Sequence, residues 1–136
     1  MLALLRHALR DELRLPALGE GWVLLHHEWR FRAEGRRGLK CDLLAVHLPS
    51  GRLGIVELKD ADSKLLGAEE QVRGYAALWS RDARELAPVF TQQLQAMGRL
   101  YGNTAASLCT LRPWDARLFV GVVGPDVAPR IEELAP

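Results

Sequence analysis

The chain of 136 residues has few cysteines, few lysines and no long apolar run. Its two cysteines, Cys41 and Cys109, show no metal-ligand spacing and form no disulfide framework, which is typical of proteins of the reducing cytoplasm. The longest apolar run is far shorter than the roughly 20 residues that a membrane-spanning helix needs. The first segment meets charge at Arg6 and has no small-residue cleavage site, so we expect no secretory signal. These absences predict a cytoplasmic protein that has no membrane partner.

Several common catalytic patterns are also missing. There is neither a P-loop nor a G-x-G-x-x-G pattern to cradle phosphates, and no serine has the glycine-elbow context of a hydrolase nucleophile. His26, His27 and Glu28 are consecutive, but neighbouring strand residues face opposite ways, which favours a structural role over a shared metal ion.

The composition is that of an ordinary globular chain. Hydrophobic residues make up 49% and charged residues 26%, and the formal net charge is +1. The length predicts one domain over 1–136.

Hydrophobic periodicity predicts an α/β fold. An apolar stripe of Leu2, Leu5, Leu9 and Leu13 indicates a helix over 2–15. The other expected elements are strands over 22–32, 39–48, 53–59 and 116–123, helix over 67–80 that resumes after a break near Arg81 or Pro88 and runs to about 101, and one helical turn over 130–134. The order helix, three strands, helix, strand favours a mixed sheet flanked by helices.

Charged residues interrupt two of the predicted strands. Glu57 and Lys59 face one side of the strand over 53–59, and Asp42 breaks the apolar run of the strand before it. A turn at 49–52 predicts that Asp42 lies opposite Lys59, so the three side chains can cluster at one sheet end. Two carboxylates beside an ammonium make a hard-oxygen site for Mg²⁺ or Mn²⁺. The alternative is a structural salt bridge.

Two neighbouring helices offer further side chains to this cluster. Glu12 of the first helix is able to reach the same sheet edge, although it also fits an ordinary solvated helix acid. Gln71 and Tyr75 share a face of the following helix because they are four residues apart.

Asp42, then Glu57-Leu58-Lys59, then Gln71-x-x-x-Tyr75, on an αβββαβ order, resembles the PD-(D/E)XK nuclease superfamily. The pattern is most similar to the branch with a Q-x-x-x-Y motif, typified by RecB-type nuclease domains. Cys41 stands before Asp42, where the family's name records a proline. The resemblance spans roughly residues 5–125 and implies a restriction endonuclease-like fold.

The resemblance also implies an activity and a role for each matched position. Asp42 and Glu57 would hold Mg²⁺ or Mn²⁺, with Glu12 as a further ligand. Lys59 would position or activate the attacking water, and Gln71 and Tyr75 would orient the site or touch the nucleic-acid backbone. The implied function is metal-dependent hydrolysis of DNA phosphodiester bonds in repair or recombination.

A basic segment lies next to the predicted site. Its five cations within eleven residues are Arg30, Arg32, Arg36, Arg37 and Lys40. We expect the turn that carries Arg36 and Arg37, together with Lys40, to contact DNA phosphates, the alternative being a solvated turn. Because so small a chain has little surface to hold DNA, a homodimer or a larger repair complex is expected. A non-catalytic nucleic-acid-binding or protein-interaction module is the rival hypothesis.

Overall fold

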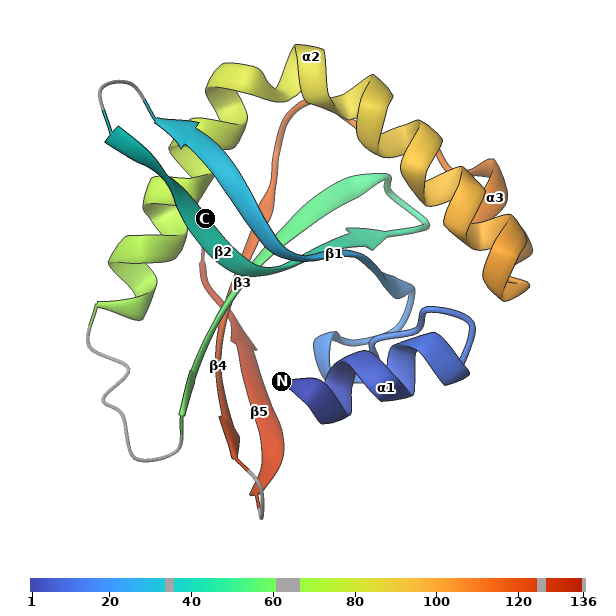
Figure 1. Ribbon diagram of the computed structural model, residues 1–136, viewed down its shortest axis with the longest axis horizontal. Coiled ribbons are helices and arrows are strands. Elements are labelled where there is room, and N and C mark those ends of the chain that lie inside the picture. The colour runs from blue at the N-terminus through green and yellow to red at the C-terminus, as the bar shows by residue number, and fades with distance from the viewer. Residues whose placement is uncertain (34–35, 61–66, 125–126, 136) are drawn as a thin grey trace.

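The computed structural model describes residues 1–33, 36–60, 67–124 and 127–135, and it contains one mixed five-stranded sheet flanked by helices (Figure 1). The strands are β1 (Trp22–Ala33), β2 (Arg36–His47), β3 (Arg52–Asp60), β4 (Arg117–Gly124) and β5 (Val127–Glu133), which lie in this order across the sheet. Neighbouring strands are antiparallel except β3 and β4, which are parallel. The predicted α/β class and four of its strands are thereby confirmed.

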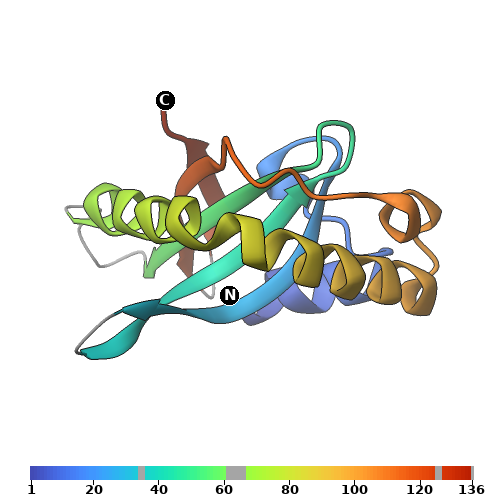
Figure 2. The same ribbon diagram turned by 90° about the horizontal axis from the view of Figure 1, so that it is seen from above.

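Helices cover both faces of the sheet, so the apolar side chains form two cores. On one face α2 (Ala68–Tyr101) packs over Ile55 and its neighbours, and on the other face α1 (Leu2–Arg10) packs over Val56 and Leu58 (Figure 2). A short 3-10 turn, η1 (Pro16–Leu18), and a five-residue helix, α3 (Thr104–Leu108), complete the described elements. As predicted, Ile55 and Glu57 of β3 share one face and Val56 and Leu58 the other; the structure shows that the face of Glu57 is the one that α2 covers.

The expected break near Arg81 or Pro88 is wrong, because α2 is a single helix of 34 residues. A proline inside a helix removes one backbone hydrogen bond and costs about 3 kcal/mol. The buried stripe nevertheless continues in phase on both sides of Pro88, through Ala83, Ala87 and Phe90, so packing against the sheet outweighs this cost. Figure 1 shows α2 curving around the sheet. No helix in the described part of the chain is both long and apolar enough to cross a bilayer.

The first helix is shorter than predicted and buries different residues. It ends at Arg10, and Glu12 and Leu13 take left-handed φ values of 52° and 69°, which turn the chain. Leu4 and Ala8 are the buried residues of α1, whereas Leu2 and Leu9 of the expected stripe are exposed.

The helical turn expected over 130–134 is also wrong, because residues 130–133 belong to β5. The edge of β4 offers unpaired backbone groups, and β5 pairs with them in an antiparallel register that places Ile131 opposite Gly121. A Cβ at Gly121 would lie 2.8 Å from Ile131 Cγ1 and 2.9 Å from the Arg130 carbonyl oxygen, so the close approach of β5 requires glycine.

The hairpin of β2 and β3 has a different register from the predicted one. Gly51 adopts a left-handed φ of 71° and closes the turn early, so that His47 already pairs with Arg52. The ladder runs from this pair to Leu43 opposite Val56. Continued by one residue, the register puts Asp42 opposite Glu57 instead of Lys59. This correction brings the two carboxyl groups closer together than the sequence predicted.

Candidate active site

Glu57 of β3 is the centre of the candidate site. Its side chain is only 5% exposed and lies on the sheet face that α2 covers. Burial raises the pKa of the Glu57 carboxyl to about 8, and the hydrogen bond to Asp42 and the charge of that group add to the rise. Glu57 therefore holds a proton through neutral pH unless a cation replaces it.

Asp42 is positioned by the end of the β2–β3 ladder. Beyond Leu43 and Val56 the two strands no longer pair, and Asp42 Oδ2 accepts a hydrogen bond of 2.6 Å from the backbone N–H of Leu58. The side chain thus replaces the strand carbonyl that would otherwise accept from this amide. Its carboxyl group also hydrogen-bonds Glu57, so the two acids share a site.

Tyr75 of α2 connects the helix to both strands. Its hydroxyl lies 2.8 Å from Glu57 Oε2 and 2.7 Å from the backbone carbonyl oxygen of Lys40. A phenol has one proton, so it donates fully to only one of these two oxygens at a time. When protonated Glu57 donates to Asp42, its Oε2 carries no full negative charge, and the Tyr75 proton is available to the Lys40 carbonyl oxygen. The Tyr75 ring is stacked with Phe31 at 6.0 Å.

Lys59 and Gln71 lie beside this group, at a surface hollow of about 390 Å³ between the strands and α2. The hollow is lined by Leu39, Lys59, Gly67, Glu70, Gln71, Gly74 and Tyr75. Neither Lys59 nor Gln71 makes a side-chain hydrogen bond or ion pair to any residue that the structure describes. Both side chains therefore offer donors to the hollow, next to the carboxyl pair.

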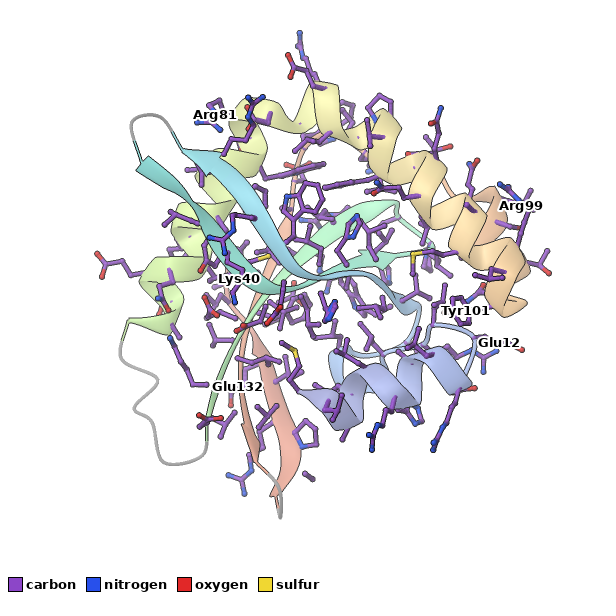
Figure 3. All side chains as sticks on the ribbon, viewed as in Figure 1. Glu12, Lys40, Arg81, Arg99, Tyr101 and Glu132 are labelled. Carbon is purple, nitrogen blue, oxygen red and sulfur yellow. The ribbon has the colours of Figure 1, made fainter. Side chains whose placement is uncertain are left out.

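Glu12 is not part of this cluster, which corrects its predicted place. Its carboxylate pairs with Arg14 at 2.7 Å, and its backbone carbonyl accepts a hydrogen bond of 2.7 Å from Asn103. Asn103 follows the C-terminal end of α2, whereas Tyr75 lies near the other end, roughly 40 Å away along the helix. Figure 3 shows Glu12 beside Tyr101, far from Lys40. The turn at Glu12 and Leu13 directs the chain away from the site.

The predicted phosphate contacts are only partly described. The side chains of Arg36 and Arg37 lie outside the described residues. Lys40 is exposed, and its Nζ lies 3.5 Å from Glu28 Oε1 in a solvent-exposed ion pair of small energetic value. Its backbone carbonyl, the acceptor for Tyr75, is a contact that sequence reasoning missed.

Cys41 is a second neighbour that the sequence did not single out as part of the site. The thiol is fully buried, and its pKa is raised by burial and then by the charges of Glu57 and Asp42. A raised pKa keeps the thiol protonated and unreactive. Its position next to Asp42 in the sequence could have indicated that Cys41 lies near the site. Regular strand alternation, however, predicts that neighbouring residues face opposite sides of the sheet.

The consecutive histidines form no metal site. His26 Nε2 lies 2.6 Å from Gln93 Oε1, and its ring packs against Trp29 and Phe90. Burial lowers the pKa of His26, which keeps its ring neutral. Among the described residues no three His, Cys, Asp or Glu side chains converge on one point, so the carboxyl pair is the best-placed set of hard donors.

The chemistry open to this arrangement is that of two hard oxygen ligands beside a lysine. Mg²⁺ is usually held by one or two carboxylates together with waters and substrate phosphates, so Asp42 and Glu57 fit its needs. No family model matches the chain, and neither the curated proteins nor the solved structures contain a significant match.

Proposed function

We propose that the chain is a metal-dependent nuclease that hydrolyses DNA phosphodiester bonds, with Asp42, Glu57 and Lys59 at the centre of its active site. The observation that carries this proposal is the pairing of two carboxyl groups, one of them 5% exposed, whose neighbours Tyr75 and Lys59 line a surface hollow. Burying carboxyl groups together is unfavourable without a compensating cation. A binding function explains why the chain carries this arrangement.

Asp42 and Glu57 would hold the cation, Mg²⁺ or Mn²⁺. The chemistry that such a cation supplies is a lower pKa for water and positive charge beside the phosphate. Tyr75 positions Glu57, because its hydroxyl ties the carboxyl to the Lys40 carbonyl and to α2. The Asp42 bond to the Leu58 amide holds the second carboxyl in place.

Lys59 and Gln71 would act on the substrate. The Lys59 ammonium is a compact charge that can donate to a phosphate oxygen and offset the negative charge that grows during attack by water. Gln71 would donate from its amide to oxygens of the neighbouring DNA backbone. Neither side chain makes a hydrogen bond or ion pair with the described residues, which leaves their donors available for this role.

The resemblance to the PD-(D/E)XK superfamily supports the same proposal. The order α1, β1, β2, β3, α2, β4 matches the αβββαβ core of a restriction endonuclease-like fold, with β5 added at the edge of the sheet. The Q-x-x-x-Y pattern gains support from the Tyr75 bond to Glu57. A role in DNA repair or recombination, with a homodimer or a larger complex holding the DNA, belongs to this proposal.

A second candidate is a non-catalytic module that binds nucleic acid or protein. The hydrogen bonds of the site favour it, because protonated Glu57, Tyr75 and Asp42 satisfy one another without a cation. In that case the acid pair would be a structural network.

The experiment that separates the two is cleavage of labelled single-stranded, duplex and branched DNA with Mg²⁺ or Mn²⁺. The wild type is compared with Glu57→Gln, which keeps the size of the side chain and removes its charge. Cleavage that is lost with EDTA and with the variant is the expected result. Absence of cleavage on every substrate by folded protein would overturn the nuclease, and DNA binding by the same inert protein would favour the module.

A further inference from the structure

We infer that the hollow beside Glu57 takes one nucleotide of a single DNA strand, which packs against the bare backbone of Gly74 on α2. The inference rests on the proposed nuclease function. It adds the strandedness of the substrate and the surface that the strand touches.

Gly74 has no reason within the described structure to be glycine. It lies in the interior of α2, where glycine is the least favourable residue after proline. Its φ is not left-handed, and a Cβ added there would have no atom within 4 Å. Gly98 of the same helix differs, because a Cβ there would lie 2.5 Å from the backbone nitrogen of Ser107. Packing thus explains Gly98 and leaves Gly74 unexplained.

The place of Gly74 supplies the reason. It lines the hollow together with Gln71, Tyr75 and Lys59, so the missing side chain leaves the helix backbone bare beside the candidate site. Glycine commonly stands where a ligand approaches the backbone closely. A methyl group at this position would point into space that no described atom occupies.

The walls of the hollow match the two halves of a nucleotide. Lys59 and Gln71 offer donors for a phosphate, and Leu39, 38% exposed, offers an apolar wall on the β2 side. The α2 side of the hollow carries the exposed carboxylate of Glu70, and the β3 side carries the ammonium of Lys59. A phosphate therefore faces β3, and the base or sugar faces Leu39.

This division favours a single strand over a duplex. Bases of a single strand are free to contact side chains, whereas a duplex keeps its bases stacked and paired. A volume of about 390 Å³ is near the lower end of small-ligand sites and suits one nucleotide unit better than paired strands.

The test uses Gly74→Ala and Gly74→Leu in the full chain, with Ser80→Leu as the matched control. Ser80 is exposed on the same helix and does not line the hollow. Gly74→Ala should raise Tm by about 4 °C, because alanine favours the helix. It should also weaken cleavage of a labelled single strand with Mn²⁺ by at least about tenfold, and Gly74→Leu should weaken it further. Ser80→Leu should cleave like the wild type.

Binding of the same labelled strand, followed by fluorescence anisotropy without metal, separates this inference from the nuclease proposal. Weaker binding by the Gly74 variants supports the inference even if no variant cleaves. Wild-type cleavage with unchanged cleavage and binding by folded Gly74→Leu would overturn the inference and leave the nuclease standing. Preference of the wild type for duplex over single strand would overturn it as well, and failure of the wild type to bind or cleave any DNA would overturn both.

Discussion

Asp42 accepts a hydrogen bond of 2.6 Å from the backbone amide of Leu58, at the point where β2 and β3 stop pairing. The side chain thereby provides the acceptor for a backbone amide that has no partner in the β2–β3 ladder. The same contact holds the Asp42 carboxyl beside Glu57. One hydrogen bond therefore both ends the pairing of β2 with β3 and positions the Asp42 carboxyl in the candidate site.

The first prediction concerns pH and stability. The pKa of Glu57 is about 8 in the folded chain and 4.5 ordinarily, so between these values the folded state binds more protons than the unfolded state. The contribution of Glu57 to stability is therefore complete below pH 4.5, and it is lost as pH rises through 8. Glu57→Gln removes this dependence. Urea unfolding of both proteins without metal, from pH 5 to pH 9, should show the variant gaining on the wild type as pH rises. Parallel curves would contradict the prediction.

The second prediction concerns metal. Mn²⁺ competes with the proton shared by Asp42 and Glu57, so its binding should strengthen with pH. A hundredfold excess over Kd adds about 2.7 kcal/mol to the free energy of unfolding. We expect millimolar Mn²⁺ to raise Tm more at pH 8 than at pH 6 in the wild type and not to raise it in Glu57→Gln. Glu12 lies beside the C-terminal end of α2, far from the site, so Glu12→Gln should keep the full rise in Tm. Loss of this rise in Glu12→Gln would show that Glu12 is a metal ligand after all.

The third prediction concerns Tyr75. Tyr75→Phe leaves the Lys40 carbonyl and the Glu57 carboxyl without their hydroxyl partner, and an unsatisfied buried polar group costs about 1–3 kcal/mol. Urea unfolding at pH 6 should show a loss of this size. Tyr101→Phe is the matched control, because the Tyr101 hydroxyl makes no hydrogen bond with the described residues, and it should be neutral. Equal effects of the two substitutions would remove Tyr75 from the network.

The fourth prediction concerns Lys59. Its ammonium makes no ion pair with the described residues, so Lys59→Ala should leave the free energy of unfolding nearly unchanged. Loss of one group that stabilises the transition state should lower the cleavage rate by about 10²- to 10³-fold. Cleavage kinetics and urea unfolding on the same preparation check both halves. A large loss of stability would instead indicate a structural salt bridge with Glu57.

Most of the elements could be predicted because their apolar residues recur with a local period. The strand at 53–59 alternates, and the face of α2 that carries Val72 and Trp79 repeats at helical spacing. The same local patterns placed Glu57 and Lys59 on one face of the strand and Gln71 and Tyr75 on one face of the helix. Each of these inferences needed only residues close together in the chain.

The errors share a different cause. Pro88 is tolerated because a sheet lies under α2, and residues 130–133 form a strand because β4 has an open edge. A backbone turn at Glu12 and Leu13 directs Glu12 away from the site, so the prediction that it continues the first helix put it in the wrong place. In each case the deciding feature, a packing partner or a backbone turn, is not specified by the apolar period of the segment itself.

The sequence by itself determined which residue types stand on which face of each strand and helix, because side-chain direction follows from backbone period. Only the tertiary structure decided the protonation of the site. The pKa of Glu57 depends on how much water α2 excludes and on the approach of Asp42 and Tyr75, and these follow from packing and from a hairpin register that a single left-handed residue, Gly51, shifts.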